Sequence, residues 1–400
     1  MKIGLVHLNL TTESGDPRMF LHISRALWLM GHKVVIYTAE FDPRCFPDLH
    51  KGLPVVVVPP PAPLGSVTGA RSFLSKIVTR LRREKLYRET VRRLAEKIDT
   101  TLDVLICQND ESYYLGLSYK TMNSQAVTVW IMNNAPFYYV RRNSFFVDLV
   151  GRLKVFLEKQ RAKKYLSGID LVVVHDLERE KMIREFGKPV TLLRIPVDFK
   201  SFYQPAKRIS LRKGQAVLLG IGSLSPNRKF EDIIVAGGLL LKKGYDTKVV
   251  LVCKDFWKDD SYKQRLFEVT RRSGMSERVI FHFEGVVEKE LREIQRQATI
   301  FVFPNHINIW SMASFEAMAA GLPLVVSRAT SLAEVLRDRE HALFFGAGDT
   351  AELALRIQEL IKSPQLYHRI AGNGQKFVKE HLNWDRYGDE LMDVVQKFSH

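Results

Sequence analysis

The sequence predicts an α/β protein made of two doubly wound parallel-sheet (Rossmann-like) domains that face each other across a cleft. Its 400 residues are too many for one ordinary core and suit two domains of roughly 200 residues each. Short apolar, β-branched runs alternate with helical segments in both halves, as is typical of parallel strands buried on both faces. A polar, loop-like stretch near 195–213 separates the two halves and predicts the domain boundary.

The predicted strands follow from runs that are short enough for a strand and rich in Val, Ile and Leu. The first half contains seven: Lys2 to His7, Lys33 to Thr38, Pro54 to Val58, Asp103 to Cys107, Ala126 to Met132, Asp170 to Val174 and Val190 to Leu193. The second half contains six: Ala216 to Gly222, Lys248 to Cys253, Arg278 to Phe283, Ala298 to Pro304, Pro323 to Ser327 and Ala342 to Phe345. In doubly wound sheets ligands bind at the carboxyl ends of the strands, so functional residues are expected in the loops that follow these runs.

The net charge of +16 is concentrated in two segments of the first half. Residues 71–97 carry a net charge of +7 and residues 141–165 a net charge of +6, which together make 13 of the 16 excess charges. The spacing of their apolar residues predicts cationic amphipathic helices. Such helices either pack on the core with a solvated basic face or dock on anionic lipid, and we expect docking at a membrane surface.

Composition excludes several other classes. No run of about 18 apolar residues is present, and the N-terminal MKIGLVHL lacks the pattern of a signal peptide. Three widely spaced cysteines argue against a disulfide framework or a zinc site. We therefore expect a cytoplasmic protein that associates peripherally with the inner face of a membrane. Charge alone suggests nucleic acid as a partner, and we expect none.

The loop after the first predicted strand reads NLTTESGDPRMF. Gly15 suits a tight turn, and Asp16 and Pro17 are expected as the N-cap and the first residue of a helix. Backbone amides at such a helix start, together with Arg18, can meet an anion. An ordinary strand-to-helix turn remains the alternative, since no GxGxxG motif follows.

The loop after the first strand of the second half reads GIGSLSPNRKFEDII. Gly222 allows a close backbone approach, and a helix is expected to begin at Phe230. Arg228 and Lys229 place two cations directly before that helix, where the helix dipole disfavours them. A bound diphosphate would explain the arrangement, because a departing diphosphate needs charge-assisted donors. The alternative is a solvated turn.

A third loop, FPNHINIWSMASFEAMAAGLPLVVS, leads into a helix expected from about Ala313 to Ala320. The amides of Ser311, Met312, Ala313 and Ser314 lie at its start, where phosphate or sugar hydroxyls can be held. Glu316, expected in the first turn, either stabilises the helix or accepts two hydrogen bonds from a ribose diol.

Two further residues of this loop are candidates. His306 is a ligand, an acid–base group or only a loop residue, and Trp310 is counted among the residues that contact substrate. No metal cluster, Ser-His-Asp order or phosphate-binding P-loop can be identified in the sequence, so we expect no bound metal.

These motifs resemble those of the retaining glycosyltransferases of family 4 (glycosyl transferases group 1), which have the GT-B architecture. The resemblance covers essentially the whole chain. SGDPRMFLHISRALWLMGHKV is similar to the family's opening loop and helix, WIMNNAPF to its acceptor-side loop, IPVDFKSFYQP to its interdomain stretch and HLNWDRYGDELMDVV to its final helix. The resemblance implies an acceptor-binding domain over 1–200, on which a C-terminal helix over 384–400 packs back, and a nucleotide-sugar-binding domain over 201–383.

The resemblance also implies roles for residues of the third loop. The family has two Glu eight positions apart, the second followed by Ala-Met-Ala and Gly-x-Pro. Glu316 matches the second and is implied to bind the ribose, whereas the first falls at Asn308, an amide that would orient the donor sugar. Glu334, in SLAEVL, matches an acid near the donor.

Two more family positions depart from the pattern. The Arg and Lys that contact the diphosphate correspond to Ser223 and Arg228, so Lys229 is expected to supply the missing charge. A His common in the acceptor-side loop corresponds to Asn133. Arg228, Lys229, Asn133 and Asn308 are the residues for which we expect a direct part in catalysis.

The implied reaction is transfer of a sugar, with retention, from a nucleoside-diphosphate donor to a glycan or lipid-linked acceptor in surface polysaccharide or glycolipid synthesis. No cofactor is implied. Two alternatives stay open. One is a GT-B-shaped nucleotide-sugar epimerase. The other is a non-catalytic membrane- or partner-binding homologue, which the departures at Ser223, Asn308 and Asn133 favour.

Overall fold

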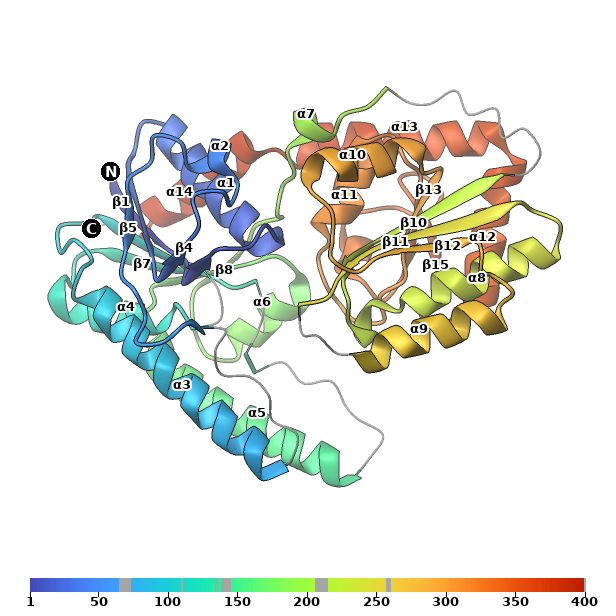
Figure 1. Ribbon diagram of the computed structural model, residues 1–400. Helices are drawn as coiled ribbons and strands as arrows, with labels where there is room; N and C mark the ends of the chain where they lie inside the picture. Colours follow the sequence, from blue (N-terminus) through green and yellow to red (C-terminus); the bar gives the residue numbers. More distant parts are fainter. Residues whose placement is uncertain are drawn as a thin grey trace. The chain divides into compact units, whose positions relative to one another are not determined.

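The protein is described from a computed structural model of its 400 residues. The described residues are 1–64, 73–108, 111–133, 136–137, 145–205, 215–256 and 260–398. They form two compact units: Met1–Arg194 together with Trp384–His400, and Ile195–Asn383. Each unit is built on one large parallel sheet with helices on both of its faces (Figure 1).

The first unit contains a seven-stranded parallel sheet of order β5-β3-β1-β6-β7-β8-β9. Its strands are β1 (Lys2–Val6), β3 (Lys33–Thr38), β5 (Val55–Val57), β6 (Val104–Gln108), β7 (Val127–Ile131), β8 (Leu171–Val174) and β9 (Val190–Leu192). All seven predicted runs form these strands, which confirms the pattern from which they were inferred. A separate pair, β2 (Asn9–Leu10) and β4 (Glu40–Phe41), was not predicted, because two residues carry no periodicity.

Helices cover both faces of this sheet (Figure 1). Those of the first unit are α1 (Gly15–Leu29), α2 (Pro47–His50), α3 (Phe73–Ala95), α4 (Tyr114–Met122), α5 (Phe145–Leu166), α6 (Leu177–Arg184) and α14 (Trp384–Gln396). Helix α14 packs on α1, where the rings of His22 and Trp384 stack with centroids 4.7 Å apart. The last helix of the described chain therefore completes the first unit.

The second unit contains a six-stranded parallel sheet of order β12-β11-β10-β13-β14-β15. Its strands are β10 (Ala216–Ser223), β11 (Thr247–Lys254), β12 (Val279–His282), β13 (Ile300–Phe303), β14 (Leu324–Ser327) and β15 (Leu343–Phe345). Its helices are α7 (Phe199–Phe202), α8 (Phe230–Lys242), α9 (Asp260–Arg272), α10 (Glu288–Gln297), α11 (Met312–Ala319), α12 (Thr350–Lys362) and α13 (Pro364–His381). The six predicted runs all form strands here, so the doubly wound fold class is confirmed in both units.

The strand order of each sheet fixes where a ligand can enter. In the first unit the chain order reverses between β1 and β6, and in the second unit between β10 and β13. Loops that leave two such strands diverge to opposite faces and open a crevice at the carboxyl edge of the sheet. The loops after β1, β6, β10 and β13 are therefore the positions in which functional side chains are expected.

The start of α1 differs from the prediction. The helix begins at Gly15 and follows an extended Ser14 with φ −145°, so Asp16 is its second residue and Pro17 its third. The amide of Arg18 donates to the carbonyl of Ser14 over 3.1 Å and closes the first turn. Proline lacks an N–H, and since amides of the first turn have no helical partner, it is tolerated there beyond the first position. Asp16 is therefore not the N-cap.

Candidate functional site

The loop from β10 to α8 brings Gly222 and Arg228 together. Ser223 ends the strand, a 3₁₀ turn spans Pro226–Arg228, and α8 begins at Phe230 as predicted. A Cβ atom at Gly222 would lie 3.2 Å from Nε of Arg228. Glycine at this position thus leaves room for the Arg228 side chain to lie against the end of β10, beside the crevice.

Lys229 occupies the N-cap position of α8 in the left-handed conformation, with φ 55° and ψ 40°. This backbone conformation costs a residue with a Cβ about 1–2 kcal/mol. Nζ of Lys229 lies 3.8 Å from Oε1 of Glu231, and Arg265 lies 3.0 Å from the same oxygen. The acidic first turn of α8 thus offsets the unfavourable placement of a cation at a helix start.

A hydrogen bond joins the first turn of α8 to the loop after β13. Nε2 of His306, which follows β13, lies 2.8 Å from Oδ2 of Asp232 in the first turn of α8. Burial raises the pKa of the Asp232 carboxyl, and the hydrogen bond with His306 acts in the opposite direction. Gly348, at φ 79°, packs behind the imidazole, since a Cβ there would lie 3.1 Å from Cε1 of His306. His306 is thus the partner of a buried carboxylate.

Helix α11 is capped from within its own first turn. Oγ of Ser311 accepts a hydrogen bond from the amide of Ser314 over 3.1 Å, so one of the four predicted donor amides is already used. Met312 and Ala313 are the first two helical residues and are half-buried. Because the helix begins at Met312, Glu316 is its fifth residue and lies in the second turn, not in the first as predicted. Glu316 is only 2% exposed.

Two further predicted residues have polar partners in the second unit. The indole N–H of Trp310 donates to the carbonyl of Ile195 over 3.1 Å, and its ring packs on Phe315 at 4.8 Å. Trp310 thus holds the first residue of this unit against α11. Nδ2 of Asn308 lies 3.5 Å from Oε1 of Glu334, while its Oδ1 is buried without a hydrogen-bond partner among the described residues. The structure therefore brings Asn308 and Glu334 together.

The first unit gathers polar groups at the carboxyl edge of its sheet. Asn133, after β7, donates through Nδ2 to Oδ1 of Asp16 over 3.2 Å, and its Oδ1 lies 3.2 Å from Nε2 of His175. Gln108, at the end of β6, donates to the backbone carbonyl of Asp16 over 3.3 Å. The end of β6 and the residue that follows β7 therefore both contact Asp16, and His175, after β8, is linked to it through Asn133. Of the other predicted residues, Gly15 is exposed and Arg18 half-buried, both on α1.

Two buried histidines at this edge were missed by the sequence analysis. His7 and His175 each directly follow a strand, are 1% and 2% exposed, and burial lowers the pKa of each to about 4. The available signal was their position, since His7 ends one predicted strand and His175 directly follows another. Within the predicted acceptor-side loop WIMNNAPF, residues 134–135 lie outside the described residues.

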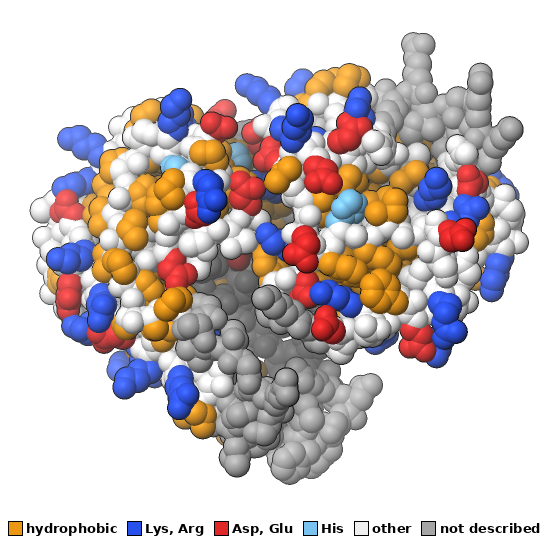
Figure 2. Space-filling model, viewed as in Figure 1, with side chains coloured by type: hydrophobic (Ala, Val, Ile, Leu, Met, Phe, Trp, Pro, Cys, Tyr) orange, Lys and Arg blue, Asp and Glu red, His pale blue; other side chains and the backbone are white. Residues whose placement is uncertain are grey.

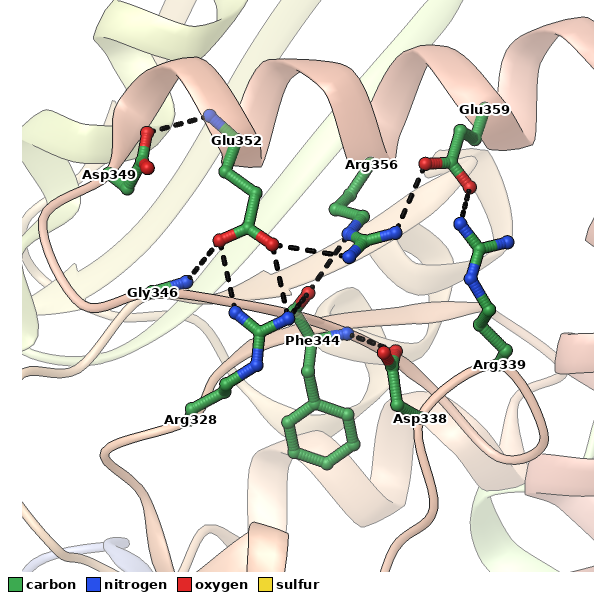
Figure 3. A network of polar contacts seen from close by, with 9 residues as sticks. All are labelled: Arg328, Asp338, Arg339, Phe344, Gly346, Asp349, Glu352, Arg356 and Glu359. Atoms are coloured by element: carbon green, nitrogen blue, oxygen red, sulfur yellow. Dashed lines mark hydrogen bonds and ion pairs between the residues drawn. The ribbon is translucent and has the colours of Figure 1, made fainter.

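A polar network at the carboxyl ends of β14 and β15 has a structural role (Figure 3). Glu352, in the first turn of α12, accepts hydrogen bonds from Arg328 at 3.0 Å and from the amide of Gly346 at 2.7 Å, and Arg356 lies 3.2 Å away. The Arg328 guanidinium, followed by these other donors, lowers the pKa of Glu352 to about 2. The network ties α12 to the residues that follow two strands.

The basic helices α3 and α5 run side by side in the first unit (Figure 1), joined by Arg161 and Glu84 at 2.9 Å. Their C-terminal halves are packed on the core through residues such as Leu94 and Ala162. Further towards their N-terminal ends both helices carry exposed apolar residues, namely Val78 (46%), Leu81 (60%), Leu153 (59%), Phe156 (56%) and Leu157 (55%). Residues 71–72 and 141–144 of the two predicted segments lie outside the described residues.

On the described part of the face drawn in Figure 2, Lys and Arg side chains are dispersed among acidic ones over both units. Within the described ranges, no three His, Cys, Asp or Glu side chains are placed to hold a metal ion together. None of the described helices is both long and apolar enough to cross a membrane.

Comparison with known proteins adds to this geometry. Residues 204–377 match the model of the family Glycosyl transferases group 1. Mannosylfructose-phosphate synthase of Agrobacterium fabrum (strain C58 / ATCC 33970) is 21% identical over 418 residues, covering 97% of this chain and 87% of that protein. The matched segment lies within the second unit, whereas the relative is similar over nearly the whole chain.

Two solved structures share the fold of the whole chain. Anabaena HepE in complex with UDP and glucose has a TM-score of 0.74 at 15% identity and covers 99% of this chain and 100% of its own. WaaG, a glycosyltransferase involved in lipopolysaccharide biosynthesis, has a TM-score of 0.67 at 15% identity, with 98% and 99% covered. At these identities the likeness concerns the fold.

Proposed function

Since this chain belongs to the glycosyl transferases group 1, has the GT-B fold and transfers a sugar from a nucleotide sugar, we propose that its donor is a UDP-linked hexose and its acceptor a glycan or lipid-linked glycan. Transfer proceeds with retention of the anomeric configuration. The proposed pathway is the synthesis of a surface polysaccharide or glycolipid. A UDP-linked donor is supported by HepE, a structural neighbour whose crystal structure contains UDP and glucose.

The observation that carries the proposal is the His306–Asp232 pair, which ties the β10–α8 loop to the β13–α11 loop at 2.8 Å. These two loops leave the strands at the switch point of the second sheet, where a doubly wound fold binds nucleotides. The pair ties the first turn of α8, directly after Arg228 and Lys229, to the loop that leads into α11. A diphosphate between them would meet cations and helix amides together.

Each donor-side residue has a proposed role. Arg228 and Lys229 hold the diphosphate and stabilise its charge as it leaves. Glu316 binds the ribose, and Asn308 with Glu334 binds hydroxyls of the sugar, which uses the otherwise unpartnered Oδ1 of Asn308. The short side chain of Ser223 leaves space for the diphosphate at the end of β10.

The proposed acceptor half-site lies in the first unit, which also carries the exposed apolar residues of α3 and α5. Arg82, Arg83 and Arg152 are exposed beside Leu81 and Leu153 on these helices. Apolar residues flanked by cations suit docking to anionic lipid, where each basic residue contributes about 1 kcal/mol. WaaG, which resembles this chain in fold, is involved in lipopolysaccharide biosynthesis, and a lipid-linked acceptor would place the enzyme at such a surface.

A thermal-shift screen against nucleotide sugars tests the donor. A UDP-sugar at 100 times its dissociation constant stabilises the protein by about 2.7 kcal/mol, whereas GDP- and ADP-sugars leave it unchanged. Glu316→Gln should weaken UDP binding at least about tenfold, since it loses a charge-assisted hydrogen bond. Glu340→Gln, at a carboxylate of the same unit whose side chain is 45% exposed, is the matched control.

Product analysis completes the test. The expected product from the stabilising donor is a glycoside with retained configuration, formed only when an acceptor is supplied. Unchanged UDP affinity in Glu316→Gln would remove this residue from the site. A new sugar nucleotide formed without an acceptor would instead identify an epimerase.

A further inference from the structure

Strand β11 ends in a lysine that lies beside the end of β10. The two strands are neighbours in the second sheet (Figure 1), and Lys254, the last residue of β11, pairs in register with Ser223, the last residue of β10. The carbonyl of Lys254 also accepts a hydrogen bond from the amide of Leu224 over 2.8 Å. Lys254 therefore lies at the carboxyl edge of the sheet, on the strand next to the switch point between β10 and β13.

The side chain of Lys254 projects from the face of the sheet opposite α8. A Cβ atom at Gly220 or at Gly222 would contact side chains of α8, so both of these positions face that helix. Successive residues of a strand alternate between the two faces, and residues paired in register share a face. Ser223 and Lys254 therefore face the other side, towards which the β13–α11 loop turns.

Two neighbours determine where the side chain of Lys254 can lie. Gly285, in the loop after β12, has the left-handed φ of 75°, and a Cβ atom there would lie 3.0 Å from Cδ of Lys254. Nζ of Lys254 lies 5.3 Å from the ring centroid of Phe256, a residue that is 43% exposed. Glycine thus leaves room for the stem, and the ring supports the ammonium group at an exposed position.

The positive charge of Lys254 is not balanced as those of nearby lysines are. Asp255, the next residue in the chain, lies 2.8 Å from Nζ of Lys263 on α9, and Lys229 lies 3.8 Å from Glu231. Within the described part of the chain, Lys254 forms no comparable ion pair and contacts an aromatic ring instead. A ring occupies one side of an ammonium group, and the N–H donors on the other side remain suited to an anion.

We propose that Lys254 is a further binding residue for the diphosphate of the nucleotide donor, and that Phe256 and Gly285 are positioning residues for its side chain. This inference rests on the proposed function. Arg228 lies against Gly222 on the α8 side of the sheet, whereas Lys254 comes from the opposite face. A diphosphate at the carboxyl ends of β10 and β11 meets one cation from each face. Lysine suits this role, because a point charge on a flexible stem binds phosphate without a fixed orientation.

Calorimetric titration of the whole protein with UDP, uridine and inorganic pyrophosphate tests the assignment. Lys254→Met keeps a stem of similar length and removes the charge. It should weaken the binding of UDP and of pyrophosphate about tenfold, the loss of one charge-assisted contact. Uridine has no phosphate, so its affinity should be unchanged, which also shows that the variant is folded.

Two further variants separate the charge of Lys254 from its place in the strand. Lys254→Arg retains the charge and should bind UDP within about threefold of wild type. Lys248→Met removes an exposed lysine from the same strand and the same face, at the amino end of the sheet, and should bind UDP as wild type does.

The positioning role of Phe256 is tested by its coupling to Lys254. Phe256→Leu should weaken pyrophosphate binding about two- to fivefold, because the ammonium group is no longer held over a ring. In a Lys254→Met background the same substitution should have no further effect. An equal loss in both backgrounds would show that Phe256 acts independently of Lys254.

The outcomes distinguish this inference from the proposed function. Wild-type affinity of Lys254→Met for both UDP and pyrophosphate overturns the inference and leaves the UDP-linked donor in place. Equal weakening of UDP and uridine assigns Lys254 to the nucleoside and overturns it as well. If the wild-type protein binds pyrophosphate through Lys254 but does not bind UDP, the proposed donor is wrong and the diphosphate site stands. If it binds neither, both proposals are wrong.

Discussion

Lys229 is the residue in which backbone strain and proposed function coincide. Its left-handed conformation at φ 55° is one that glycine adopts without cost, yet a lysine occupies it. Strained residues persist where the surrounding structure holds them, and they concentrate at binding sites. The strain here places an ammonium group at the start of α8, beside Arg228, where a diphosphate is proposed to bind.

Substituting Lys229 separates its backbone from its side chain. Lys229→Gly and Lys229→Ala both remove the ammonium group. Because each loses one charge-assisted contact, both should weaken UDP binding by about tenfold. Only alanine keeps a Cβ in the left-handed region, so the glycine variant should be more stable by about 0.5–1 kcal/mol. Urea unfolding and UDP titration measure the two effects. Equal stability of the variants would show that the loop relaxes once lysine is removed.

His7 predicts a pH dependence of stability. Its folded pKa of about 4 lies below the ordinary 6.5, because the ring is buried. Above pH 6.5 the ring is neutral in both states. As the pH falls towards 4, His7 becomes protonated in the unfolded chain but stays neutral in the folded protein. The free energy of unfolding therefore decreases, by about 2 kcal/mol between pH 7 and pH 5. Urea unfolding of His7→Gln should lack this component. His50→Gln, at a residue outside the core, should keep the wild-type dependence.

The sequence predicts single residues well where the backbone sets their position. Gly222 and Arg228 were assigned to one loop, and the structure places them in contact. The pairing of His306 with Asp232 could not be predicted, because it joins residues 74 positions apart through the crossing of two loops. Such a contact depends on strand order, which no local pattern contains.

At the scale of elements, the cap of α11 tests whether its first turn binds the donor. Ser311 and Ser363 cap α11 and α13 in the same way, each accepting from the third amide of its helix, at 3.1 and 3.2 Å. Ser311→Ala and Ser363→Ala should therefore each cost about 1 kcal/mol in thermal unfolding. Only Ser311→Ala should also weaken UDP-sugar binding. Similar binding in both variants would place the ligand away from this helix start.

Strands were more predictable than helix starts for a physical reason. All thirteen runs form strands because parallel strands buried on two faces need continuous apolar residues. A short stretch of sequence is enough to show this pattern. The start of α1 was wrong by two residues, since Ser14, Gly15, Asp16 and Pro17 all suit the first turn of a helix. The choice among them is made by the Arg18–Ser14 hydrogen bond, which the sequence does not display.

At the scale of the whole molecule, the exposed apolar residues of α5 predict membrane association. Leu157 is 55% exposed on this helix, and Leu355 is 50% exposed on α12 of the other unit. Leu157→Ser should reduce binding to phosphatidylserine-containing vesicles about tenfold, given about 1.5–3 kcal/mol for burying a leucine. Leu355→Ser should bind as wild type in the same flotation assay. Equal binding of both variants would remove α5 from the membrane contact.

The position of α14 in the chain affects how the first unit folds during synthesis. It covers α1, where Leu391, Met392 and Val395 are buried, yet it follows the second unit in the chain. A ribosome adds about 5–20 residues per second, so the roughly 190 residues of the second unit delay α14 by about 10–40 s. During that interval the second unit can fold completely while the apolar side of α1 stays uncovered. The unit that is synthesised first is therefore finished last, and its open face is the surface that a chaperone would meet on the nascent chain.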